Sequence, residues 1–61
     1  MVETLKRMMI EELSYSGVLH IKHIGLSPTH KYLVAELLLE ENIIRIDKDG
    51  FVYLVNNQNF S

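Results

Sequence analysis

Hydrophobic residues in the first part of the chain follow one face of a helix. Steps of three and four residues separate Val2, Leu5, Met9 and Leu13, which is the spacing of an α-helix that packs by one side. Charged residues occupy many of the positions between them, as expected for the solvent side. Gly17 follows this run, and glycine is common immediately after a helix. The pattern predicts a first helix that ends just before Gly17.

Residues 17–25, GVLHIKHIG, show no single period. A period of two leaves no clean apolar face, whereas a short helix would bring Val18, Ile21 and Ile24 onto one side. We expect a short extended segment at Val18-Leu19 followed by one helical turn. The alternative is a strand that pairs with a later hairpin.

Ser27 and Pro28 mark the start of another helix. Serine is favoured at the N-cap, and proline at the first helical position, where its missing N–H needs no partner. This helix can continue to Glu41, and Asn42 tolerates the left-handed conformation that often follows a helix. Its apolar residues extend most of the way around the axis, and they are Tyr32, Leu33, Val34, Ala35, Leu37, Leu38 and Leu39. Such a helix is typically buried on all sides, so we expect a partner subunit to cover its far side.

Two short β-rich runs follow this helix. Ile43, Ile44 and Ile46 form the first, residues 51–55 (FVYLV) form the second, and Lys48-Asp49-Gly50 lies between them. A glycine-containing turn between β-branched and aromatic residues predicts a β-hairpin. The remaining residues, 56–61, are polar apart from one phenylalanine, and we expect a frayed tail.

The order of these signals resembles that of a known family. GLS at 25–27, a helix, LLEENIIR at 38–45, a short polar turn and FVYLV are similar to the second half of winged-helix transcriptional regulators, and the likeness extends over about residues 5–55. It implies an α+β fold, a small winged helix-turn-helix of two to three helices with a C-terminal β-hairpin as the wing. It also implies that the helix after GLS is the recognition helix, which enters the major groove of duplex DNA.

Length and composition limit the alternatives. A chain of 61 residues is expected to form one domain, residues 1–61, near the lower size at which a core alone supports a fold. It has no cysteine to add a disulfide, and 48% of its residues are hydrophobic, so a homodimer would bury surplus apolar surface. No apolar run reaches the ~18 residues of a membrane span, and no signal-peptide pattern precedes the first helix. We therefore expect a soluble, cytoplasmic protein.

Charge is distributed unevenly along the chain. The formal net charge is −2, with four cations and three acids in residues 1–33 and two cations and five acids in residues 34–61. No acid lies between Leu13 and Ala35. A locally basic stretch can meet phosphate, although the overall balance gives no long-range attraction to nucleic acid.

The resemblance implies which residues would contact duplex DNA. The start of the helix after GLS would read base edges, and its neighbours would hold phosphates. The candidate DNA-binding residues are Lys22, His23, Ser27, Thr29, His30, Lys31, Tyr32, Arg45 and Lys48. Asp47 and Asp49 flank Lys48, which favours a merely soluble turn at the tip of the wing. The function expected first is a transcriptional regulator that occludes or marks a site on DNA.

The alternative is a winged-helix domain that mediates protein–protein contact or dimerisation without nucleic acid. Its interface would lie on the apolar helix of residues 28–41, with Tyr15, Leu33 and Leu37 as dimer contacts, since aromatic and leucine side chains supply buried contact area. The two functions are compatible, because a dimer formed through one face can bind a two-fold site on DNA with the other.

Catalysis and metal binding have less support. No serine or threonine stands in a pattern typical of a nucleophile, and so short a chain has little room for both a core and a pocket. We expect neither an enzyme nor a cofactor. His20, His23 and His30 invite a zinc hypothesis, but no cysteine or nearby acid completes a tetrahedral site. We expect surface histidines and no metal.

Overall fold

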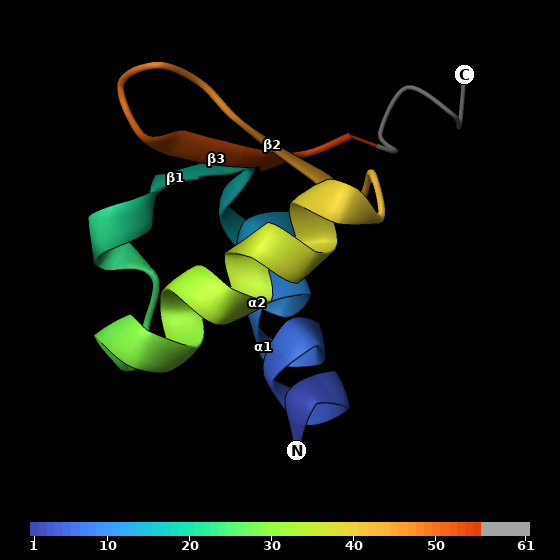
Figure 1. The fold of residues 1–61 in the computed structure, drawn as a ribbon. Coiled ribbons are helices and arrows are strands. Elements are labelled where there is room, and N and C mark those ends of the chain that lie inside the picture. The colour runs from blue at the N-terminus through green and yellow to red at the C-terminus, as the bar shows by residue number, and fades with distance from the viewer. Residues whose placement is uncertain (56–61) are drawn as a thin grey trace.

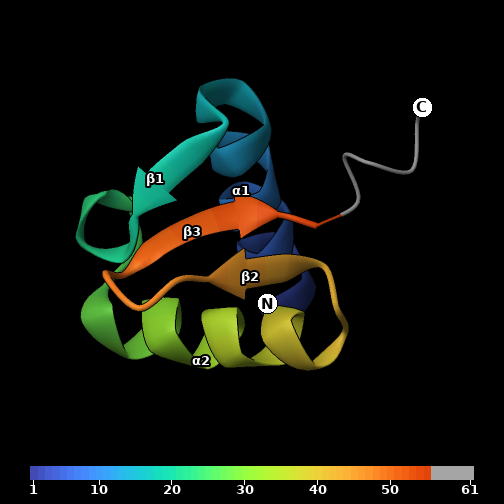
Figure 2. The ribbon, with the colours of Figure 1, turned by 90° about the horizontal axis from the view of Figure 1, so that it is seen from above.

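The computed structural model describes residues 1–55 and arranges them in two layers (Figure 1). One layer holds two α-helices and the other a three-stranded antiparallel sheet. The elements are α1 (Val2–Ser16), β1 (Val18–His20), the 3-10 helix η1 (Ile21–His23), α2 (Pro28–Glu40), β2 (Ile44–Ile46) and β3 (Phe51–Leu54). Both helices lie against one face of the sheet, and no described element covers the other face (Figures 1 and 2). The predicted α+β class is confirmed.

The sheet is held together by its last strand. The strand order is β1-β3-β2, so that β3 pairs antiparallel with both neighbours while β1 and β2 do not touch. Val52 lies opposite Leu19 on one side and Ile46 on the other, and Tyr53 lies between Val18 and Arg45. Because side chains alternate along a strand, Val52 faces the helices and is fully buried, while Tyr53 faces away.

The core lies between the helices and the inner face of the sheet. Its buried residues are Met9, Leu13, Ile24, Val34, Ala35, Leu38, Ile44 and Val52. Lys6 closes the gap between the two helices at the edge of this core, because its Nζ donates to Glu41 Oε2 at 2.7 Å. Each helix contributes part of its surface, so neither can be stable without the other and the sheet.

The predicted ends of the two helices are confirmed. α1 ends at Ser16, and Gly17 follows with φ +86°. α2 has Ser27 at its N-cap and Pro28 at its first position, and it ends at Glu40, one residue before the predicted limit. Asn42 adopts the left-handed conformation with φ +62°, as predicted for a residue that ends a helix.

The predicted hairpin is also present, as β2 and β3. Its turn is fixed by Asp47, whose Oδ1 accepts hydrogen bonds from the backbone N–H groups of Asp49 and Phe51, both at 2.9 Å. Aspartate commonly fixes turns in this way. Gly50 completes the turn with φ +94°, a conformation that favours glycine.

Residues 18–24 combine the two alternatives that the sequence left open. Val18–His20 is a strand paired with β3, and Ile21–His23 is a single 3-10 turn. The extended start and the helical turn are therefore confirmed, and so is the pairing with the hairpin. No α-helix lies between β1 and α2, so the described chain has two α-helices rather than three.

α2 is covered on one side only within the described chain, so its burial by a partner subunit stays a prediction. Val34, Ala35 and Leu38 face the core, whereas Tyr32 and Leu33 are 57% and 47% exposed. Glu36 and Glu40 are exposed as well. The helix is apolar nearly all round, but within the described chain only one side of it is covered.

Candidate nucleic-acid interface

Three segments meet at one end of the molecule. The turn η1, the first turn of α2 and the hairpin turn all lie at the end that appears on the left in both views (Figures 1 and 2). A hydrogen bond from the Ile21 N–H to the Gly50 carbonyl, at 2.8 Å, joins β1 and η1 to the hairpin turn. The fold thus brings most of the candidate DNA-binding residues, from distant parts of the sequence, to one end.

Lys31 connects two of these segments from the inside. Its Nζ donates to the backbone carbonyl of Lys22 at 3.3 Å, and the residue is only 7% exposed. The sequence hypothesis placed Lys31 on the DNA-reading side of the helix, and the structure does not. Its aliphatic stem lies in line with Val34, Ala35 and Leu38 on the buried side of α2, while its ammonium group reaches η1, as long cationic side chains often do.

The other residues at the start of α2 are exposed. Ser27, Thr29, His30 and Tyr32 all face solvent. The hydroxyl of Ser27 does not cap the helix, because Oγ is hydrogen-bonded to Nδ1 of His30 at 2.9 Å. The first N–H groups of α2 therefore have no side-chain cap, and such groups, together with the helix dipole, favour an anion.

Lys22 and His23 lie beside this helix start on η1, and both are exposed. We call the exposed residues Lys22, His23, Ser27, Thr29 and His30 the basic cluster. Glu12 of α1 is the acid that reaches toward it, and Glu12 Oε1 already accepts the Gly25 N–H at 3.1 Å. The cluster can therefore present positive charge and unpaired donors to a phosphate group.

His20 fixes the hairpin turn against η1. The Lys22 N–H donates to Nδ1 of His20 at 3.2 Å, so Nδ1 carries a lone pair. The opposite ring nitrogen, Nε2, lies 2.8 Å from the Asp49 carbonyl, and it must therefore carry the proton that it donates. Both contacts are satisfied by neutral His20 in one tautomer.

Arg45 and Lys48 are exposed, but they occupy different surfaces. Arg45 lies in the middle of β2 on the face of the sheet turned away from the helices, opposite Tyr53. Lys48 lies in the hairpin turn between Asp47 and Asp49. The flanking acids oppose a phosphate contact by Lys48, whereas Arg45 lies opposite the uncharged Tyr53.

The predicted dimer contacts do not share one face. Tyr15 is 98% exposed near the end of α1, and Leu33 is exposed on α2. Leu37 is half-buried.

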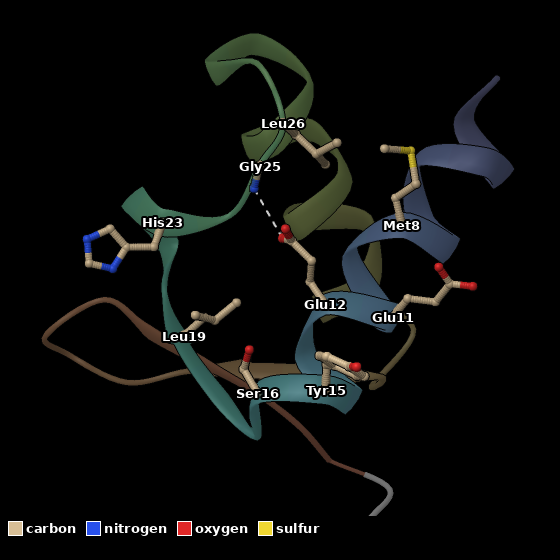
Figure 3. A pocket seen from close by; sticks show the side chains of 9 residues that line it. All are labelled: Met8, Glu11, Glu12, Tyr15, Ser16, Leu19, His23, Gly25 and Leu26. Atoms are coloured by element: carbon tan, nitrogen blue, oxygen red, sulfur yellow. Dashed lines mark hydrogen bonds between the residues drawn. The ribbon is translucent and has the colours of Figure 1, made fainter.

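Tyr15 borders a groove with a volume of about 560 Å³, between α1 and the segment that runs from β1 to the start of α2 (Figure 3). Met8, Leu19 and Leu26 give this groove an apolar lining, and the hydrogen bond from Gly25 to Glu12 crosses it.

Lys6 is the titratable group whose environment changes its acidity most clearly. Its hydrogen bond to Glu41 raises the pKa of Lys6 above the ordinary value of 10.5, against a smaller opposing effect of partial burial, and the charges of Glu3 and Glu41 add to the rise. This pair lies between the helices and serves packing rather than the basic cluster.

Two further properties concern the whole described chain. Across residues 1–55, no three histidine or acidic side chains gather closely enough to hold a metal ion. Neither described helix is long and apolar enough to cross a membrane.

Sequence reasoning missed two groups of residues. The sequence suggests His20 as a zinc ligand or a surface histidine, whereas its contact with the Asp49 carbonyl depends on a turn far along the chain. The outward side chains of the sheet were also missed, although the alternation in Phe51-Val52-Tyr53 indicates that Phe51 and Tyr53 share a face.

No family model matches the chain, and no curated protein or solved structure is significantly similar to it.

Proposed function

We propose that this chain is a small DNA-binding protein of the winged helix-turn-helix kind, and that it acts as a transcriptional regulator by occupying its site. The observation that carries the proposal is the bond between Lys31 and Lys22, which holds η1 against α2. Through it, a turn and a following helix form one unit, with the basic cluster on its exposed side. The hairpin that follows α2 would serve as the wing.

In this proposal α2 approaches the major groove by its first turns. Thr29, His30 and Tyr32 would reach base edges, because they are exposed on these turns. Lys22, His23 and the free N–H groups of α2 would hold phosphates, which fix register without reading sequence. Glu36 and Glu40 on the outer side of α2 would repel the DNA backbone, so the contact is limited to the N-terminal half of the helix.

The test is the binding of a fluorescein-labelled random-sequence duplex, followed by anisotropy at about 50 mM and about 200 mM salt. Binding through several phosphates should weaken by orders of magnitude between these conditions. Lys22→Gln should bind the duplex more weakly than the unmodified protein does at both salt concentrations. Its affinity should also depend less steeply on salt, by the equivalent of about one phosphate contact.

Arg7→Gln is the matched control, because it removes the same charge from an exposed site on α1 outside the basic cluster. It should bind the duplex as the unmodified protein does. Lys31 is unsuitable for this test, since replacing a buried side chain would disturb the fold. The proposal fails if the unmodified protein does not bind at about 50 mM salt and about 100 µM protein, the weak end of non-specific affinities. It also fails if Arg7→Gln weakens binding as much as Lys22→Gln.

One observation favours a second function, a protein–protein interaction module. Tyr32, Leu33 and Leu39 are exposed together on the outer half of α2, and large apolar side chains that gather on a surface are typical of interfaces. A second copy of the chain would cover them together with Glu36 and Glu40, which lie between Tyr32 and Leu33 around the helix.

Sedimentation equilibrium distinguishes this second function from a monomeric DNA-binding protein. Leu33→Glu should convert a dimer to a monomer, whereas Met8→Glu, a similar change at an equally exposed site on α1, should leave the dimer intact. A protein that sediments as a monomer over a wide concentration range would exclude self-association through α2.

A further inference from the structure

The face of the sheet turned away from the helices carries an unusual set of side chains. Its members are Val18, His20, Arg45, Phe51 and Tyr53, and we call them the outer sheet face. Phe51 and Tyr53 are each 41% exposed. Figure 2 looks down on this face, and no described helix or strand crosses it. Two aromatic rings are therefore open to solvent on the central strand.

The two rings are placed side by side along β3. They are two residues apart on one strand, which separates their Cα atoms by about 6.8 Å along the strand. His20 lies next to Phe51, with ring centroids 5.0 Å apart and planes at 85°, and His20 is itself held by the Asp49 carbonyl. The Phe51 ring is thus positioned by a neighbour that the fold fixes.

The charge of the outer sheet face is positive. Arg45 lies directly opposite Tyr53 in the strand register, and it forms no salt bridge with any residue in 1–55. None of the five members is acidic. Two acids of the hairpin turn, Asp47 and Asp49, are each two residues away from a member of this face, and Oδ1 of Asp47 accepts hydrogen bonds from two backbone N–H groups of the turn. The face therefore combines stackable rings with a free guanidinium group.

This combination matches unpaired nucleotides. Bases of a single strand stack on aromatic side chains, and an antiparallel sheet with exposed rings is a recurrent platform for this contact. Arginine adds attraction to phosphate and can itself stack on a base. A paired duplex hides the flat faces of its bases inside the helix and cannot make the same contact.

We propose that the outer sheet face binds single-stranded nucleic acid by stacking bases on Phe51 and Tyr53, with Arg45 on the phosphate backbone. This site is separate from the basic cluster proposed for duplex DNA and does not depend on it. Recognition by stacking tolerates different base sequences, so the site would favour unpaired segments over particular sequences.

The test uses fluorescein-labelled oligothymidylate and the random-sequence duplex in parallel anisotropy titrations. Phe51→Ile and Tyr53→Ile keep an apolar residue of high β-propensity but remove the flat ring. Each should weaken binding of oligothymidylate about 5- to 150-fold, the range measured for loss of one stacked aromatic residue. Neither should change binding of the duplex.

Conservative variants and a distant aromatic residue serve as controls. Phe51→Tyr and Tyr53→Phe keep the rings and should bind oligothymidylate as the unmodified protein does. Tyr15→Ile removes an exposed ring from α1 and should leave this binding unchanged. Circular dichroism of every variant separates a lost contact from a lost fold.

The proposal is overturned if the unmodified protein does not bind oligothymidylate at low salt. It is also overturned if both isoleucine variants bind oligothymidylate as tightly as the unmodified protein does. It is also overturned if the isoleucine variants change the sedimenting mass instead, because the outer sheet face would then be an interface between copies of the chain. A protein that binds oligothymidylate but not the duplex would support this site while rejecting the proposed regulator.

Discussion

Gly50, in the hairpin turn, lies against the His20 side chain of β1. Its φ is +94°, and a Cβ built on it would lie 2.8 Å from Nε2 of His20. Gly17 also has a positive φ, +86°, but a Cβ there would meet no atom within 4 Å. The two glycines share a backbone constraint, and only Gly50 has a neighbour that excludes a side chain.

Gly50→Ala should therefore destabilise the fold more than Gly17→Ala. Backbone strain alone costs of order 1–3 kcal/mol at either position, and the clash with His20 adds to it only at Gly50. Urea denaturation gives the free energy of unfolding of each variant. The excess should disappear when Gly50→Ala is made together with His20→Ala, as a double-mutant cycle measures. Equal costs for the two glycines in the unmodified background would contradict this account.

Lys6 gives the fold a dependence on alkaline pH. Because the pKa of Lys6 is raised by its hydrogen bond to Glu41, its contribution to stability is complete below the unfolded-state pKa near 10.5. The contribution is lost as the pH rises through the higher folded-state pKa. The free energy of unfolding should therefore decrease less in Lys6→Met than in the unmodified protein when the pH rises from about 9 to about 11.5. This range brackets the titration of lysine. Arg7→Met, on the same helix, should leave that loss unchanged.

At the scale of the elements, the sequence predicts most of the helix ends and turns, which depend on neighbouring residues. Ser27-Pro28, Asn42 and the turn before Phe51 mark their elements correctly, because caps and turns depend on a few neighbouring residues. The strand at 18–20 depends on β3, more than thirty residues later, and the local pattern could only leave it as an alternative. The family resemblance implies that the members of the basic cluster contact DNA, and this stays a prediction.

The error at Lys31 has a different cause. Its position fits the spacing of Val34, Ala35 and Leu38 at steps of three, four and seven, so periodicity alone places it on the buried side. A lysine can occupy such a buried position, because its stem is apolar and its ammonium group can reach a carbonyl at the margin of the core. The prediction for Lys31 considered only its charge.

Two substitutions at Lys31 test this placement. Lys31→Met keeps the length and apolar stem and should cost about 0.5–1.5 kcal/mol, the typical net value of one lost hydrogen bond. Lys31→Glu places a carboxylate against the Lys22 carbonyl, and leaving a buried charge without a partner costs about 3–5 kcal/mol. Urea denaturation of both variants provides the comparison. If methionine is as harmful as glutamate, the ammonium group rather than the stem determines the role of this residue.

At the scale of the whole molecule, the core is small. A chain of 61 residues is expected to have a free energy of unfolding of roughly 3–9 kcal/mol, from about 0.05–0.15 kcal/mol per residue. Eight buried hydrophobic residues supply the core, while Tyr32, Leu33, Phe51 and Tyr53 remain exposed. Single substitutions in the core should therefore have large relative effects.

Val52 is the most informative core position, because it is fully buried and pairs with a residue of each neighbouring strand. Val52→Ala removes two methyl groups and should cost about 2 kcal/mol or more, from lost burial and the cavity left behind. Val18→Ala, on the outer sheet face, should stay within about 0.5 kcal/mol. Thermal unfolding followed by circular dichroism compares them, and equal costs would show that the sheet is not packed as described.

The strand order β1-β3-β2 also has a consequence for synthesis in the cell. β1 and β2 have no hydrogen bonds to each other, so neither has a partner until β3 is available. As the chain emerges from the ribosome, α1, β1 and α2 appear first, and their apolar faces stay without a sheet until residue 54 has cleared the exit tunnel. Because long-range pairing of this kind is slow and leaves hydrophobic surface open to aggregation, completion of the fold awaits the last strand. A ribosome paused within the hairpin would hold a nascent chain in which β1 and β2 have no partner strand and the two helical segments have no sheet to pack against.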